Sequence, residues 1–161
     1  MTQSGRRISG TRCFDRDQFL IKHCTDKSVL HVGCTCHPNF LRNLRQGTLL
    51  HPKLEQVALK CVGIDIVADD ITAMQALGHD VHVMNATDLS KLQGTFFDVI
   101  VLADIIEHVT NPGAIINEAI KVMNPTGEII VTVPNAFGLI RIIKLFFRHE
   151  QVHPDHVAYY S

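Results

Sequence analysis

The sequence shows no excess of charge of either sign. Its 161 residues include 15 lysines and arginines against 16 aspartates and glutamates, which gives a formal net charge of −1. General nucleic-acid-binding proteins normally carry a basic surplus, so we expect no nucleic-acid partner. Intrinsic disorder is excluded as well, because 46% of the residues are hydrophobic and only 19% are charged. A chain of this length favours one domain, and we place it over residues 1–161.

Long hydrophobic runs are also missing. The longest apolar stretch, residues 136–147, is interrupted by Arg141 and Lys144 and is shorter than the roughly 20 residues that a bilayer-spanning helix needs. We expect this stretch to form a helix that packs in the core or against another subunit, without membrane contact. The first twenty residues lack the apolar segment of a secretory leader, and the cysteine count of five is odd. These features predict a cytoplasmic protein with reduced cysteines.

Five short apolar runs rich in β-branched residues alternate with segments of helical character. The runs cover residues 29–34, 61–66, 81–86, 97–103 and 128–133, and the helical segments cover 15–24, 38–45, 54–59, 68–77, 88–92 and 112–123. Continuous apolar character, as at 99–102, indicates strands that are covered on both faces. Strands that alternate with helices pair in parallel through right-handed crossovers. The sequence therefore predicts an α/β fold with a doubly wound, mostly parallel sheet and a core over residues 28–135.

Turn and capping residues fall between these segments. Gly78 follows the helical segment 68–77 at a position that prefers glycine. Asn111 followed by Pro112 is typical of the start of a helix. The sequence Asn-Pro-Thr-Gly at 124–127 predicts a turn that leads into the last strand.

Polar residues follow four of the predicted strands. Asp65, Asn85 and Asp104 come at or just past strand ends, and Asn135 follows the last strand. In open doubly wound sheets the carboxyl ends of the strands face one ligand crevice, so we expect these side chains to converge there. The loop at 33–38 lacks the glycine spacing of a dinucleotide-binding loop and the Gly-Lys-Ser/Thr of a phosphate loop. These absences favour a ligand without phosphates, and Asp65 suits the two hydroxyls of a ribose.

Four segments occur in an order and spacing that are specific when taken together. They are Val-Leu-His-Val-Gly-Cys at 29–34, Val-Gly-Ile-Asp-Ile at 62–66, the stretch 97–109 with its Asp and Glu-His, and the stretch 123–135 that ends in Pro-Asn. In this order they resemble the class I S-adenosylmethionine-dependent methyltransferases, and most closely the small-molecule and sugar type associated with glycan modification. The similarity covers residues 28–135 and extends more weakly over 153–161. It implies a Rossmann-like fold, S-adenosylmethionine as cofactor, and a small molecule or a sugar or glycan precursor as acceptor.

By position, the resemblance assigns seven residues to the cofactor. They are Gly33, Cys34, Asp65, Ile66, Asn85, Ala86 and Asp104. It implies that Gly33 and Cys34 line the methionine end of the cofactor and that Asp65 holds the ribose hydroxyls. It also implies that Ile66, Asn85 and Ala86 surround adenine. Asp104 then lies beside the sulfonium, where a carboxylate suits the positive charges of the donor. We expect Asp65→Ala to weaken cofactor binding at least about tenfold and to leave the stability of the ligand-free protein unchanged.

Three further residues are candidates for catalysis. They are Glu107, His108 and His156. A histidine among them is expected to accept the proton of the acceptor, while the rest of the site positions the reactants and excludes water. Cys34, Cys36 and the neighbouring histidine lack the paired ligand spacing of a structural zinc site, so we expect no metal.

The sequence departs from the family pattern in the first loop and at the C-terminal side. His31 stands at the acidic position of the family, and Thr35 and His37 stand where glycines are usual. The last two strands of the family sheet have no counterpart after residue 135. These departures favour an alternative, a non-catalytic methyltransferase-like module for binding or assembly, whereas the retained acidic residues favour an enzyme.

The last predicted strand, 128–133, would form an apolar edge that invites association with another strand. The residues that follow, 137–147, carry more apolar side chains than one helix face buries against its own domain. We therefore expect a symmetric homodimer through residues 128–147. In the alternative, a monomer, the helix covers the strand.

Overall fold

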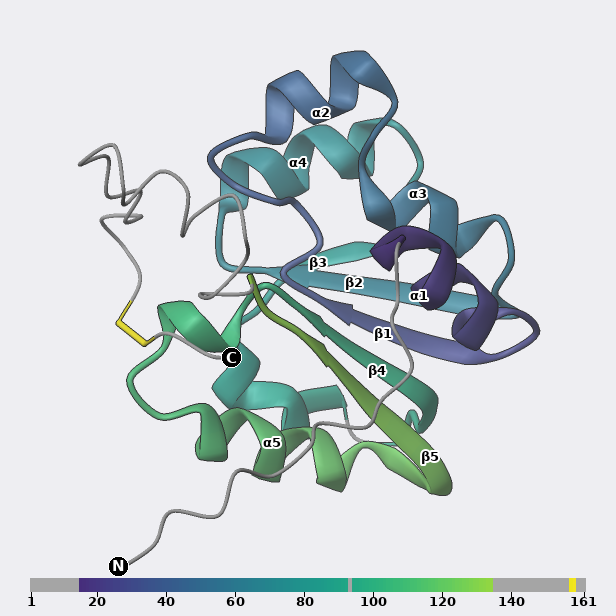
Figure 1. The fold of residues 1–161 in the computed structure, drawn as a ribbon, viewed down its shortest axis with the longest axis vertical. Helices are drawn as coiled ribbons and strands as arrows, with labels where there is room; N and C mark the ends of the chain where they lie inside the picture. Colours follow the sequence, from purple (N-terminus) through teal and green to yellow (C-terminus); the bar gives the residue numbers. More distant parts are fainter. Residues whose placement is uncertain (1–14, 93, 135–156, 159–161) are drawn as a thin grey trace, which may run out of the picture.

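The computed structural model describes residues 15–92, 94–134 and 157–158 (Figure 1). Strands and helices alternate along most of this length, as the apolar runs predict. In chain order the elements are α1 (Arg16–Cys24), β1 (Ser28–Val32), α2 (Phe40–Gln46), α3 (Leu50–Glu55), β2 (Lys60–Asp65), α4 (Ala68–Ala76), β3 (Val81–Val83), η1 (Ala86–Leu92), β4 (Phe97–Ala103), η2 (Ile106–His108), α5 (Pro112–Lys121) and β5 (Met123–Thr132). The elements η1 and η2 are 3₁₀ helices.

The five strands of the described chain form one parallel sheet with the order β3-β2-β1-β4-β5. The chain builds outward from β1 to β3, then returns to place β4 on the other side of β1. The strand order therefore reverses between β1 and β4, which is the position where ligands bind in such sheets. The predicted doubly wound, parallel α/β fold is confirmed. In the described part of the chain, β5 forms one edge of the sheet.

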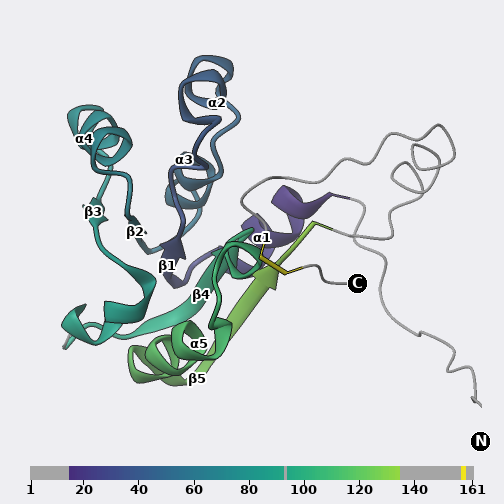
Figure 2. The same ribbon diagram turned by 90° about the vertical axis from the view of Figure 1, so that its left-hand side faces the viewer.

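Different helices cover the two faces of the sheet, as Figures 1 and 2 show. Even-numbered residues of β1 and β4, together with Phe97, pack with η1 and α5 in a cluster that includes Leu30 and Ile115. Odd-numbered residues of the same strands pack with α1 and α3 in a cluster that includes Val29 and Leu54. A third cluster joins α2 and α4 beside β3. Because side chains on both faces of the central strands are buried, these strands are continuously apolar in sequence.

Three helix ends carry a residue that stabilises them, and those at Asn111 and Gly78 were predicted from the sequence. Asp15 caps α1, with its carboxylate accepting a hydrogen bond from the Gln18 N–H at 3.1 Å. The Asn111 side chain accepts from the Ala114 N–H at 3.1 Å, and Pro112 occupies the first turn of α5. Gly78 follows α4 with φ of 91°, in the left-handed region that glycine adopts without strain.

Two predicted elements differ from the structure. The helix predicted at 54–59 lies at Leu50–Glu55, because Leu50, His51 and Leu54 are buried and Pro52 is tolerated in a first turn. The predicted turn at 124–127 is wrong, since these residues belong to β5. They bulge opposite Asp98, because the register passes from Phe97–Met123 directly to Val99–Glu128. A bulge at a sheet edge accommodates a proline that a central strand would not.

Several predictions fall on parts of the chain that the structure leaves undescribed. The C-terminal helix at 136–147 and most of the predicted dimer contact at 128–147 lie outside the described residues. Among the helices that the structure does describe, none has the length and apolarity needed to cross a bilayer.

Candidate functional site

A cavity of about 740 Å³ lies at the carboxyl ends of the strands. Its volume is in the range of small-molecule sites, about 300–1,000 Å³. Nine of the ten predicted site residues line it, namely Gly33, Cys34, Asp65, Ile66, Asn85, Ala86, Asp104, Glu107 and His108. The tenth, His156, lies outside the described residues. The strand ends therefore bring the described members of the predicted set to one crevice.

The loop after β1 is held against β2 by main-chain hydrogen bonds. The N–H groups of Gly33 and Cys34 donate to the Ile64 carbonyl at 2.8 and 3.2 Å. Gly33 has φ of 78°, and a Cβ at this position would lie 2.1 Å from Ile105 Cδ1. Because the conformation and the crowding both exclude a side chain, the main chain itself forms the cavity wall here.

Asp65 is held by four hydrogen bonds from its own protein. Its Oδ2 accepts from the Thr35 N–H at 3.1 Å and from the Thr35 hydroxyl at 2.7 Å. Its Oδ1 accepts from the N–H groups of Ile66 and Val67 at 2.7 and 3.2 Å. Thr35 is completely buried, so the side chain that replaces a family glycine is directed at this carboxylate. Removal of Asp65 must therefore affect stability, which corrects the expectation drawn from the sequence.

His31, which stands at the family's acidic position, belongs to a buried histidine cluster that the sequence did not reveal. His31 Nδ1 lies 3.4 Å from His51 Nδ1, and His51 Nε2 lies 3.2 Å from Glu55 Oε1. Glu55 Oε2 contacts His79 Nδ1 at 2.6 Å. Burial lowers the pKa of His31 well below its usual value and that of His51 to about 4. His31 therefore presents a neutral ring to the cavity that it lines.

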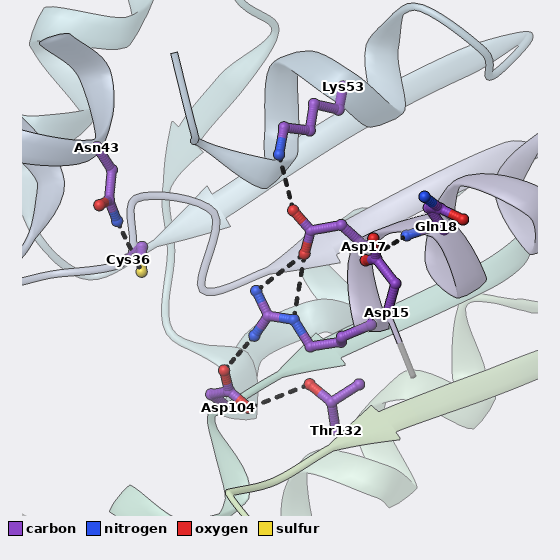
Figure 3. Close-up of polar contacts among 9 residues, drawn as sticks. Asp15, Asp17, Gln18, Cys36, Asn43, Lys53, Asp104 and Thr132 are labelled. Atoms are coloured by element: carbon purple, nitrogen blue, oxygen red, sulfur yellow. Dashed lines mark hydrogen bonds and ion pairs between the residues drawn. The ribbon is translucent and has the colours of Figure 1, made fainter. Parts of the chain in front are cut away.

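Asp104 forms an ion pair with Arg16 of α1 (Figure 3). The guanidinium also contacts Asp17 at 3.2 Å, and Asp17 pairs with Lys53 at 2.8 Å. Thr132 of β5 donates its hydroxyl to Asp104 Oδ1 at 3.2 Å. Arg16 lines the cavity, but no motif marks it, and it is 88 residues from Asp104 in sequence.

Glu107 is 1% exposed, and neither of its carboxylate oxygens has a hydrogen-bond partner among the described residues. Burial, and then the charge of Asp104, raise the pKa of the Glu107 carboxyl. Its main-chain carbonyl accepts hydrogen bonds from the N–H groups of Val157 at 2.8 Å and Ala158 at 3.3 Å. The C-terminal segment therefore reaches η2, at the residues that directly follow the predicted His156.

The adenine side predicted from the resemblance combines an apolar and a polar wall. Ile66 is 68% exposed and lines the cavity, so it offers an apolar surface to a ligand. Asn85 accepts hydrogen bonds from the N–H and the hydroxyl of Thr87, both at 3.0 Å, and so its side chain is fixed.

The cysteines and histidines near the loop do not form a metal site among the described residues, where no group of three suitable ligands is found. Cys34 and Cys61 are buried, and burial raises the pKa of both thiols. Cys36 is exposed instead, and it accepts a hydrogen bond from Asn43 at 3.4 Å.

Comparison with known proteins matches a family model described as a methyltransferase domain over residues 6–161. Ubiquinone biosynthesis O-methyltransferases of Hydrogenovibrio crunogenus and Rhodopseudomonas palustris are each 25% identical to this chain, over 116 and 133 residues. The matches cover 68% and 80% of this chain but 44% and 48% of those proteins. The chain thus spans about half the length of the curated relatives it matches.

Solved structures show the same fold. A SAM-dependent methyltransferase from Archaeoglobus fulgidus matches with a TM-score of 0.56 at 20% identity, covering 85% of this chain and 59% of that chain. The N-methyltransferase NodS from Bradyrhizobium japonicum WM9 matches with a TM-score of 0.57 at 16% identity, covering 88% and 89%. At these identities the likeness concerns the fold alone.

Proposed function

The chain belongs to the class I S-adenosylmethionine-dependent methyltransferases, and from this membership we propose that it transfers a methyl group to an oxygen or nitrogen of a small molecule or of a sugar or glycan precursor. The observation that carries the proposal is the cavity at the switch point, which nine predicted residues line. The similar proteins include enzymes named as O- and as N-methyltransferases, so both acceptor atoms stay within the proposal.

The residues of the cavity fit S-adenosylmethionine. Asp65 offers a fixed carboxylate for the ribose hydroxyls, and Ile66 offers an exposed apolar surface for adenine. Gly33 leaves main chain rather than a side chain at the methionine end. Because Thr35 already donates its hydroxyl to Asp65, a ribose hydroxyl would share or replace that hydrogen bond.

Within this proposal the chain's own residues position the reactants and accept one proton from the acceptor. S-adenosylmethionine supplies a methyl group on a positively charged sulfur, which a nucleophile takes directly. The cavity is proposed to align the acceptor with the donor and, once both are bound, to exclude water from the reacting atoms. His108, which lines the cavity, is proposed to accept the acceptor's proton, and His156 is a second candidate for the same role.

A binding module without catalysis is the second candidate. It is favoured by the observation that the two strand-end carboxylates are already engaged, Asp65 by Thr35 and Asp104 by Arg16. In that case the cavity would be closed to a donor by contacts internal to the protein.

Titration calorimetry with S-adenosylmethionine and S-adenosylhomocysteine distinguishes the two candidates. The enzyme proposal expects both compounds to bind the folded chain, and Asp65→Ala to weaken binding at least about tenfold, which is 1.4 kcal/mol. Asp80→Ala is the matched control, since the side chain of this aspartate is 52% exposed, lies outside the cavity lining and pairs with His82. Absence of binding to the folded wild type would favour the module.

We also propose a cytoplasmic location and a homodimer through residues 128–147. Of this region the structure describes the strand, where Val131 is 40% exposed and β4 is the neighbour of β5 in the described sheet. Light scattering at micromolar concentration tests the dimer, and Ile143→Lys is expected to dissociate it. A monomer with reduced stability in this variant would show that the C-terminal segment covers its own strand.

A further inference from the structure

Glu107 differs from the other acidic residues that line the cavity. Asp65 accepts four hydrogen bonds, and Asp104 pairs with Arg16 and accepts from Thr132. Glu107 lines the same cavity and is 1% exposed, yet in the part of the chain that the structure describes both of its side-chain oxygens lack a hydrogen-bond partner. A buried polar group without a partner is uncommon in folded proteins and calls for a physical explanation.

In the described cavity wall no arginine or lysine is available to pair with Glu107. Arg16, the cation of the described cavity wall, already contacts Asp104 and Asp17. His108 is adjacent in sequence and favours the ionised carboxylate, but burial and Asp104 outweigh it and raise the pKa of Glu107. Because Glu107 is 1% exposed, its carboxylate, when ionised, acts over a longer range than a carboxylate at the surface. A positive charge in the cavity would therefore be stabilised.

We propose that Glu107 makes the cavity selective for positive charge, so that it holds the cationic sulfonium donor more tightly than the neutral thioether product. This inference rests on the proposed function. Because the Glu107 oxygens are buried, the residue acts through its electric field and is a positioning residue rather than a catalytic one.

Such selectivity would help turnover as well as binding. In methyl transfer the bond from methyl carbon to sulfur breaks, its electron pair stays on sulfur, and the carbon bonds to the acceptor. The acceptor's proton passes to a base, for which His108 is proposed. The sulfur is then neutral and loses its attraction to Glu107. The product is thereby bound less tightly than the donor it came from.

Titration calorimetry of the full chain with S-adenosylmethionine and with S-adenosylhomocysteine tests this inference. The measured quantity is the ratio of the two affinities, compared between wild type and Glu107→Gln. We expect the variant to lower the preference for S-adenosylmethionine at least about tenfold, which is 1.4 kcal/mol, while the affinity for S-adenosylhomocysteine changes little. S-adenosylmethionine also differs from S-adenosylhomocysteine in the contacts that its methyl group makes with the protein. These contacts contribute equally to the affinity ratio of wild type and of Glu107→Gln, so they cancel when the two ratios are compared.

Three further variants make the result specific. Glu107→Asp keeps the charge and is expected to retain the preference, and Glu128→Gln, a 50% exposed residue on the sheet edge, is expected to leave it unchanged. If Glu107→Gln does not fold, Glu107→Leu supplies an uncharged side chain that needs no hydrogen-bond partner. An unchanged ratio in a folded, uncharged variant that still binds S-adenosylhomocysteine overturns the inference and leaves the proposed function intact. Failure of wild type to bind either compound overturns the proposed function itself.

Discussion

Replacement of Asp65 by alanine is expected to destabilise the ligand-free protein. The variant leaves the Thr35 N–H and hydroxyl without a partner, and Thr35 is completely buried. A hydrogen bond to a charged group contributes about 1.5–3 kcal/mol to stability. The N–H groups of Ile66 and Val67 are closer to water, which can replace Asp65 as their partner, so their loss costs less. A loss of about 2–5 kcal/mol follows, which for a chain of this size is a fall in Tm of roughly 5–15 °C.

A double-mutant cycle identifies the source of this loss. Thr35→Val keeps the shape of the side chain and removes the hydroxyl that donates to Asp65 at 2.7 Å. Thermal and urea unfolding of both single variants and the double variant should give a coupling free energy of at least about 1 kcal/mol, because neighbouring partners are not additive. If Asp65→Ala melts within about 1 °C of wild type, or if the two changes are additive, the hydrogen-bond assignment is refuted.

Three other variants follow from the same site. Burial lowers the pKa of His51 from 6.5 to about 4, so between these pH values the folded protein binds fewer protons than the unfolded chain. The contribution of neutral His51 to the free energy of unfolding is therefore complete above pH 6.5 and is lost as the pH falls toward 4. His51→Gln should flatten this pH dependence in urea unfolding. Gly33→Ala places a methyl group 2.1 Å from Ile105 Cδ1 at φ of 78°, and calorimetry should show a loss of stability of about 1–3 kcal/mol. Arg16→Met should lower stability by at most about 1 kcal/mol in thermal unfolding, since Arg16 and Asp104 are 43% and 39% exposed.

The strands were predictable because their apolar character depends on local sequence. Val99 to Leu102 are buried on both faces of the sheet, and no polar residue interrupts them. The two errors concern segments whose structure depends on distant contacts. Residues 124–127 have the composition of a turn, but Asn124 donates to Asp98 at 2.7 Å and the segment joins the edge strand. The register of α3 depends on the burial of Leu50 and His51, which sequence periodicity alone does not reveal.

The site was predictable as a set of positions and not as a set of contacts. Parallel topology places every strand end at one edge, so Asp65 and Asp104 converge whatever their partners are. Their partners depend on side-chain packing between elements far apart in sequence. Thr35 is 30 residues from Asp65, and Arg16 is 88 residues from Asp104. No spacing rule relates residues at such separations.

The departures in the first loop change where negative charge acts on the cavity, and they do so without removing it. An acidic residue at position 31 would place charge at the end of β1, but His31 is neutral there because burial lowers its pKa. Asp65 is hydrogen-bonded and Asp104 is ion-paired within the protein, whereas the carboxylate of Glu107 has no hydrogen-bond partner among the described residues. The carboxylates of the described cavity wall that have no arginine or lysine partner are therefore at the end of β2 and at η2, and none is at β1. Since a cationic ligand responds to the total field, the loss of the acidic residue at β1 is by itself no evidence that donor binding is lost.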